Sequence, residues 1–444
     1  MRIRDVLRRL LPLLLVLAGI PAQGEGPLYV GGPPSLAGGF VTGTQVEGKP
    51  FRWDSTQFPL TYWTDQGGVG SMTKTQSDDL VQQAFQAWQD VPTTTISFNR
   101  AGDLGGNVTA SNADAVINAV NDCSTLPGPP AGIARPRTII YDDSSGSIMS
   151  ALGNDPNSIL GFADAVCLSG DGTDNHFNRG YAVLNGKGIT AGNASTELKP
   201  VMIHEFGHMI GLDHSQVNVN CLPFGVCGVD LDGLPTMFPI LLDGAAMSTP
   251  AVDDIAGVSE LYPGTTFAPS TGTITGTVYF SDGVTPALGF NVIARRVGDP
   301  RITAVSNVSG FLFTGDAGNP LFQDSVFGTP SPFGSHNQDL MGAYMIPGLP
   351  PGSYTVEVEG IHNSGSDAFT EGSGLNPVGY LGFEFNLLAP CSPLFLGNSG
   401  SFATCNTSDK RTITVTAGNV AAADIILIGT TGELPKYDAY EDGP

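Results

Sequence analysis

Three histidines and one glutamate fall within one short stretch, "VMIHEFGHMIGLDHS" (201–215). The chain has only six histidines in 444 residues, so half of them lie in this stretch. On a helix, His204 and His208 are four residues apart and project from one face, where their imidazole nitrogens can bind a single metal ion. Glu205 lies beside His204 and can reach a water molecule on that metal without being a ligand itself.

The residues after this helix supply a third ligand. Gly211 tolerates the left-handed conformation that ends a helix, so the chain can turn back there and deliver His214. Three histidines leave one zinc position for water, which is the open coordination of a catalytic site; a structural zinc is closed by four protein ligands. We predict one catalytic zinc held by His204, His208 and His214, with Glu205 activating the zinc-bound water. The alternative is a buried helix whose histidines bind nothing.

A mixed sheet with helices is predicted to hold this stretch in place. The segment 75–92 has its apolar residues on one face and reads as a helix, with Asp78 and Asp79 in its first turn. A second helix is expected within 249–264, with Thr249 as its N-cap. Strands are expected at 58–65, 95–100 and 137–143, and as a pair around an Asp/Gly loop within 158–186. A helix between strands indicates an α+β domain, which we place at residues 51–263.

The second half of the chain has a different pattern. Residues 264–272 are rich in Pro, Gly, Ser and Thr and read as a linker. Beyond them, short β-patterned runs alternate with turn residues, which predicts an all-β sandwich at 273–430. An insert without a clear helix or strand pattern lies at about 360–410, and an acidic tail follows at 431–444.

The N-terminus has the layout of a secretory signal peptide. A basic segment, an apolar run and small residues follow one another in residues 1–24. The apolar run is shorter than the ~20 residues of a membrane-spanning helix, so we expect cleavage, with a signal anchor as the alternative. The Gly/Pro-rich residues 25–50 have no periodicity and are expected to form a loosely ordered leader. The protein is therefore predicted to be secreted, to the extracellular medium, the periplasm or the cell surface, and not to be an integral membrane protein after cleavage.

Charge and cysteines agree with export. The formal net charge is −23, and removal of residues 1–24 takes away four Arg and one Asp and moves it to −26. Such acidity argues against nucleic acid and anionic membranes as partners. All six cysteines follow the signal, which favours disulfides. Nearness in sequence suggests Cys221–Cys227 and Cys391–Cys405, which leaves Cys123–Cys167, although six cysteines permit about fifteen pairings.

The metal-binding stretch resembles a known family. HExxHxxGxxH marks the metzincin zinc endopeptidases, and "HEFGHMIGLDHS", with Ser after the third His, resembles the matrixin (matrix metalloproteinase) branch. "PTMFP" resembles the Met-turn, with Met237 beneath the metal. "TPAVDDIAGVSELYPG" resembles the closing helix, and "WDSTQFPLTYWTD" and "AFQAWQDVPTTTISF" the first strand and helix. The resemblance spans roughly residues 51–263.

Several departures from the family bear on function. Residues 25–50 contain no cysteine, so latency through a prodomain thiol is not supported. His176 in "DNHFN" (174–178) is the only histidine of this half outside the motif, so the family's second, structural zinc is expected to be missing. The Asp-rich loop 171–174 reads as a solvated turn, with a Ca²⁺ site as the alternative. The family's Pro-x-Tyr is replaced by "PIL" (239–241), so pocket preference does not transfer.

The C-terminal half resembles the carboxypeptidase regulatory-like, transthyretin-like sandwich, chiefly through the "PPGSYTVEVEG" turn and strand. Such domains are usually spacers or binding modules, so a surface or polymer ligand is an open partner for it. The isolated His336 and His362 are expected to be surface loop residues.

We therefore expect a secreted zinc endopeptidase that hydrolyses peptide bonds of extended protein or peptide substrates. The resemblance implies that the substrate lies along an edge strand, here residues 159–166. Two alternatives stay open. One is a surface or binding protein whose metzincin domain no longer cuts, against which the intact Glu205 argues. The other is a narrow processing enzyme directed by the β domain.

Overall fold

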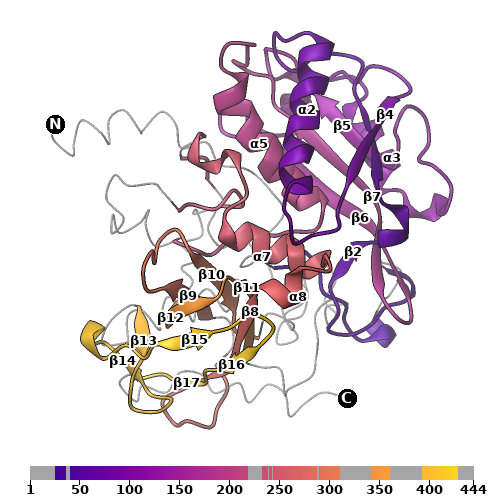
Figure 1. Cartoon of the computed structure of the whole chain (residues 1–444). Helices are drawn as coiled ribbons and strands as arrows, with labels where there is room; N and C mark the ends of the chain where they lie inside the picture. Colours follow the sequence, from indigo (N-terminus) through magenta and orange to yellow (C-terminus); the bar gives the residue numbers. More distant parts are fainter. Residues whose placement is uncertain are drawn as a thin grey trace, which may run out of the picture.

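The computed structural model describes residues 26–36, 41–218, 233–238, 240–242, 244–287, 290–310, 342–360 and 393–428. Two halves follow one another along the chain: a mixed α/β half and a β-rich half, with helix α7 between them (Figure 1). This confirms the division into an α+β part and a β-rich part. The signal peptide, both residues of the expected Cys221–Cys227 pair, and the acidic tail lie outside the described residues. Within the described residues, no helix combines the length and apolar character needed to cross a membrane.

One seven-stranded sheet organises the first half. Its order is β1-β6-β7-β5-β3-β4, with β2 also paired to β7, and all pairs are parallel except β6 with β7. Each strand expected from the sequence is present. The strands are β1 (Val41–Thr44), β2 (Phe51–Trp53), β3 (Leu60–Thr64), β4 (Phe98–Asp103), β5 (Arg137–Tyr141), β6 (Gly161–Asp171) and β7 (Asn175–Leu184).

Helices α2 and α5 lie together against this sheet (Figure 1), and their apolar side chains share its main core. The expected apolar face of α2 is buried, but the helix begins earlier than predicted. Thr73 caps it through a reciprocal box with Gln76, which places Asp78 and Asp79 in the second turn and not the first. The helices of this half are α2 (Lys74–Gln89), α3 (Ala113–Asn121), α4 (Ser147–Ala151), α5 (Ala194–Met209) and α7 (Val252–Leu261).

The start of α7 also differs from the prediction. Thr249 is extended and is not the N-cap; that position belongs to Ala251, whose N–H donates to the carboxylate of Asp254 in the first turn. The carbonyl of Thr249 instead accepts from the hydroxyl of Thr236. The acidic residue within the helix therefore decides where α7 begins.

The Gly/Pro-rich segment expected to be loose is packed onto the first half. Leu28 and Val30 are buried, and Pro27 forms an antiparallel bridge with Leu212. Residues 41–44 form β1 at the end of the sheet. Glycines and prolines here provide turns and close approach, so a segment without periodicity still has a fixed position. The boundary predicted at residue 50 does not separate an ordered region from a loose one.

The β-rich half contains two sheets packed around one apolar core. One has the order β10-β9-β12-β13-β14 with β15 on β12, and the other has the order β11-β8-β16 with β17 on β8. The strands are β8 (Gly272–Tyr279), β9 (Phe290–Arg296), β10 (Ala304–Val308), β11 (Ala343–Leu349), β12 (Gly352–Gly360), β13 (Leu394–Leu396), β14 (Ala403–Thr404), β15 (Ile413–Val415), β16 (Val420–Ala422) and β17 (Ile425–Ile426). β13 and β14 fall inside the expected insert, whose end therefore belongs to the sheet.

The expected linker is folded against the first half. It contains the short helix α8 (Phe267–Ser270). Gly264 donates to the carbonyl of Thr93 at 2.8 Å, and the hydroxyl of Thr266 donates to the carbonyl of Pro92 at 3.0 Å. These bonds hold the junction in place, so the two halves are not joined by a free tether.

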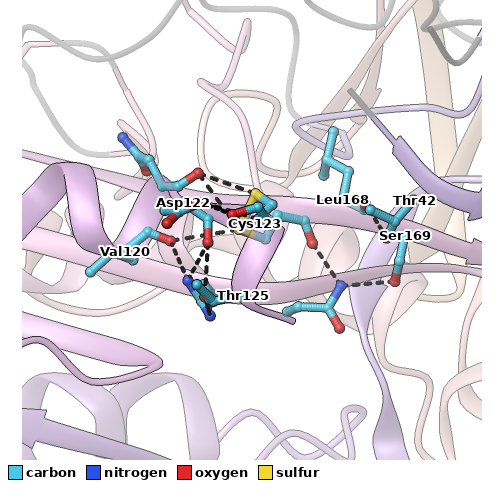
Figure 2. The surroundings of a disulfide bond; sticks show 12 residues. Thr42, Val120, Asp122, Cys123, Thr125, Leu168 and Ser169 are labelled. Carbon is cyan, nitrogen blue, oxygen red and sulfur yellow. Dashed lines mark hydrogen bonds between the residues drawn. A yellow bond between two sulfur atoms is a disulfide. The ribbon is translucent and has the colours of Figure 1, made fainter. Parts of the chain in front are cut away.

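A disulfide joins Cys123 and Cys167, as the sequence suggested, and closes a separation of 44 residues (Figure 2). It ties the end of α3 to β6. Beside it, the guanidinium of Arg179 donates to the carbonyl of Asp122 at 2.8 Å and to the hydroxyl of Thr125 at 2.6 Å. Cys405 is also disulfide-bonded, but Cys391 lies outside the described residues, so that pairing stays a prediction.

Candidate metal centre

The structure brings the predicted ligands together. Helix α5 presents His204, Glu205 and His208, and all three are buried. The helix ends at Met209, and two residues later comes Gly211, whose φ of +95° is left-handed. Its N–H donates to the carbonyl of His208, and the next N–H, of Leu212, donates to the carbonyl of Gly207, both at 2.9 Å. These two hydrogen bonds close the C-terminal end of the helix. The chain reverses there, as predicted, and brings His214 back to the helix.

The three Nε2 atoms converge on one point. The distance from His204 to His208 is 3.1 Å, and His214 lies 3.2 Å from each of them. Tetrahedral zinc with Zn–N distances of about 2.0–2.1 Å places pairs of ligand nitrogens about 3.3–3.4 Å apart. Within the described part of the chain, no other group of three potential ligands meets in this way.

The tautomers of two histidines follow from their backbone partners. Nδ1 of His204 lies 2.8 Å from the carbonyl of Thr236, and Nδ1 of His208 lies 2.9 Å from the carbonyl of Leu212. A carbonyl can only accept, so both Nδ1 atoms carry the proton and both Nε2 atoms of the neutral rings present lone pairs. Two lone pairs 3.1 Å apart repel unless a cation lies between them, so these residues fit a metal ion.

Burial keeps the ligands in their metal-binding form. It lowers the pKa of His208 to about 4. Burial, followed by the neighbouring rings, also places the pKa values of His204 and His214 well below their usual range. Neutral imidazole is the form that coordinates a metal.

Glu205 is buried without a partner. Neither carboxylate oxygen has a hydrogen-bond partner among the described residues, and burial raises the pKa of this side chain well above its usual range. A buried carboxyl without partners is costly in a structural role. A position beside the three nitrogens and a raised pKa suit a group that accepts a proton and passes it on.

Met237 packs against α5, and its carbonyl accepts from the N–H of Ser215 at 2.8 Å; its place beneath a metal stays a prediction. It is fully buried, and a Cβ placed on Gly207 would come within 2.2 Å of its sulfur. Gly207, the second variable position of the HExxH motif, is therefore glycine because the methionine occupies that space. Sequence reasoning did not assign a role to this glycine.

The turn that carries Met237 is held by Asp254. Its carboxylate accepts from the N–H groups of Thr236 at 2.8 Å and Met237 at 2.9 Å. The carbonyl of Thr236 in turn accepts from His204. Asp254, the second aspartate of the "DDIAG" helix, thus orients His204 through the backbone of Thr236. The sequence indicated no role for this aspartate beyond the resemblance of the whole helix.

Three aromatic donors fix the last turns of α5. The indole N–H of Trp88 donates to the carbonyl of Ile203 and that of Trp53 to the carbonyl of Met209, both at 2.8 Å. The hydroxyl of Tyr262 donates to the carbonyl of Ile210. Sequence reasoning missed these contacts, because they come from elements up to 156 residues away in the chain.

The expected substrate edge lies beside the glutamate. A Cβ placed on Gly161, the first residue of β6, would lie 3.0–3.2 Å from the side chain of Glu205. β6 pairs along its length with β7, whereas β1 reaches only Leu168–Asp171 on its other side. Among the described strands, the second edge of residues 161–167 has no partner.

The loop that offered a calcium alternative has its own hydrogen bonds. Asp171 accepts from the N–H groups of Thr173 and Asp174, and His176 lies 3.4 Å from its carboxylate. Asp174 pairs with Arg52. These bonds are those of a closed turn, and calcium binding here stays a prediction. A cavity of about 480 Å³ beside Arg52 and His176 does not reach the three metal ligands. Pro239, His336 and His362 lie outside the described residues.

Comparisons with known proteins add little. No family model and no curated protein matches the chain. Among solved structures, BcpA, the major pilin subunit of Bacillus cereus, matches with a TM-score of 0.18 and 12% identity over 36% of this chain and 31% of the pilin. A point variant of the same pilin matches with a TM-score of 0.17, 13% identity and 30% of its length covered. Similarity this slight carries no argument about fold or function.

Proposed function

We propose that the protein is a secreted zinc-dependent endopeptidase of the metzincin type, most similar to the matrixins. The observation that carries the proposal is the convergence of His204, His208 and His214 next to Glu205, a buried carboxylate without partners. The Met237 turn and the glycine-ended helix support the same family. The Cys123–Cys167 disulfide supports an oxidising compartment, as expected of an exported protein.

The chemistry divides between the metal and the glutamate. A bound zinc supplies a Lewis acid that polarises the scissile carbonyl and makes water acidic near neutral pH. The three histidines hold that ion and leave one side of it open. Glu205 takes the proton of the attacking water and delivers it to the leaving nitrogen. Burial raises the pKa of this carboxyl, which makes the carboxylate a stronger base for the first transfer.

Residues 161–167 of β6 provide the place for the substrate. An extended peptide can add to the unpaired edge through main-chain hydrogen bonds. The start of this edge is Gly161, which lies against Glu205, so a peptide aligned there passes the proton-transfer group. Main-chain pairing recognises extended backbone of any sequence, which fits an endopeptidase acting on unfolded or flexible segments.

The test uses the full-length mature chain, loaded with zinc and incubated with a mixed peptide library. Cleavage should occur and should stop when a chelator removes the metal. Glu205→Ala should retain zinc and lose cleavage by about 10²–10⁴-fold, the usual contribution of a positioned acid–base group. Asp114→Ala is the control and should cut normally, because this exposed side chain is on α3, whose apolar residues belong to a different core cluster from those of α5. A wild-type chain that binds zinc but cuts nothing in the library would instead be a metal-containing binding protein.

A further inference from the structure

One sheet of the β-rich half is buried on both faces around Asn291 and Ile293. In β9, Val292 and Ala294 point into the sandwich core, whereas Asn291 and Ile293 point to the opposite side, and all four are buried. The outer face continues onto the neighbouring strands. In the register, Ile293 lies between Ser306 of β10 and Glu357 of β12, and both of these are buried. The outer face of a sandwich that serves as a spacer would be in water and polar. Here something covers it.

The cover is the chain that directly follows the third metal ligand. Val217 packs between Ile293 and Ala304 in a small apolar cluster of its own. The side-chain amide of Asn291 donates to the carbonyl of Gln216 at 3.0 Å. The next residue is held as well, because the guanidinium of Arg295 donates to the side-chain oxygen of Asn218 at 2.8 Å.

A buried aspartate of α7 connects the same two parts. Asp253 accepts from the hydroxyl of Ser215, the residue after His214, and from the N–H of Ser306 at 2.8 Å. The Ser215 hydroxyl also accepts from the N–H of Val217 at 3.1 Å. The carboxylate therefore bonds both the metal loop and strand β10. α7 itself packs against β10 and β11, as its place between the halves indicates (Figure 1).

His214 needs such support more than the other two ligands. Its Nδ1 atom is buried and has no hydrogen-bond partner among the described residues, whereas those of His204 and His208 are fixed by carbonyls. Its ring contacts the other two histidine rings, but no described acceptor sets its orientation. The backbone on either side of it therefore contributes to its position, and residues 215–218 on the C-terminal side lie on the sandwich.

We propose that the β-sandwich is a working part of the metal centre: its outer sheet face, through Asn291 and Ile293 and with Asp253, positions the loop that carries His214. This inference rests on the zinc site of the proposed function. The named side chains are positioning residues and do not touch the metal or the substrate. The sandwich is then neither a spacer nor a separable binding module, whatever else it binds.

The test measures zinc affinity, without substrate, in the full-length chain. Ile293→Ala and Asn291→Ala alter the outer face, and Val356→Ala is the matched control. Val356 lies on β12, is fully buried, and faces the sandwich core. Competition against a chromogenic chelator gives the dissociation constant, and the cobalt(II)-substituted protein gives a spectrum sensitive to ligand geometry. Thermal unfolding of each metal-free variant shows how much stability it has lost.

We expect Ile293→Ala and Asn291→Ala to weaken zinc binding by about 10-fold and to alter the cobalt spectrum, as loss of outer support for a ligand does. Val356→Ala should lower the melting temperature at least as much as Asn291→Ala and leave affinity and spectrum unchanged. Equal affinities in all variants, or losses that follow melting temperature alone, would overturn the inference. A wild-type chain that binds zinc but does not cut would refute the proposed function and leave this result interpretable.

Discussion

The metal ligands come from two regions that are held in different ways. His204 and His208 belong to helix α5, whose spacing sets their direction and whose last carbonyls are fixed by Trp88 and Trp53. His214 belongs to a loop, and the supports of that loop come from both ends of the chain. Before it, the backbone N–H of Asp213 donates to the carbonyl of Gly26 at 3.1 Å. After it, residues 215–218 lie on the β-sandwich.

The three ligands of one site are thus positioned by both local and distant parts of the sequence. A helix sets the direction of two ligands through contacts within four residues, and distant residues such as Thr236 and Trp88 then fix it in place. The third ligand depends on segments that start about 190 residues before it and end about 90 residues after it, by the numbering. Changes in the supports of the loop should therefore loosen the metal while leaving α5 intact.

The largest effect should come from Gly211, where the two regions meet. Gly211→Ala combines a left-handed φ with a Cβ 2.7 Å from the ring of Phe177. We expect zinc affinity to fall by about 10- to 100-fold, because the turn that returns His214 is displaced. The strain alone should lower the free energy of unfolding by about 1–2 kcal/mol, with more from the ring contact. Chelator competition and chemical unfolding measure the two quantities.

Gly153→Ala is the matched control for that strain. Gly153 has a φ of +86°, and no atom lies within 4 Å of a Cβ placed there. It should lose about 1–2 kcal/mol of unfolding free energy from the backbone alone and keep full zinc affinity. If both variants lose the metal equally, the helix ending at Gly211 has no special role in presenting His214.

A smaller effect should follow from shortening the N-terminus. A mature chain that begins at Tyr29 loses the Gly26 carbonyl that accepts from Asp213, and the Leu28 N–H that donates to Gly211 at 2.7 Å. Leu28→Ala loses the same buried side chain but keeps both backbone bonds. The truncated chain should be less stable than Leu28→Ala by about 2 kcal/mol, from two hydrogen bonds of about 1 kcal/mol each.

Zinc affinity separates the two N-terminal variants further. Only the truncated chain should bind the metal more weakly, since only it releases the loop before His214. Equal affinity in the truncated chain and in Leu28→Ala would mean that the N-terminal segment adds stability without positioning the ligand. The sandwich would then remain a distant support of the loop, together with Met237, whose carbonyl accepts from the N–H of Ser215 at 2.8 Å.

The sequence was sufficient wherever the relevant contacts are local. The four-residue spacing of His204 and His208 and the turn at Gly211 follow from helix geometry, and the structure confirms all three positions. The apolar face of α2 and the strands of the sheet follow from periodicity in the same way. The helix was predicted from residue 75 and begins at Lys74, but Asp78 and Asp79 were wrongly placed in its first turn, because the Thr73 cap was overlooked.

The sequence was insufficient where a contact joins residues far apart in the chain and the segment has no helical or strand periodicity. Residues 26–30 gave no helical or strand pattern, yet they are packed, because single backbone bonds to the metal loop need no side-chain signature. The β-rich half was expected to be a spacer or a binding module, because nothing in the sequence pattern shows that Asn291 bonds to the carbonyl of Gln216. The sequence indicated Asp253 only as part of the stretch "TPAVDDIAGVSELYPG", without a role of its own.

The central claim is an open, three-histidine zinc centre, and X-ray absorption at the zinc edge of the full-length protein tests it most directly. With metal content measured in parallel, the account predicts one zinc per chain, three imidazole ligands, and a fourth position filled by a light atom that exchanges with added small anions. His214→Ala should reduce the imidazole count to two. A centre closed by four protein ligands, or a chain that purifies and reconstitutes without zinc, would contradict the account.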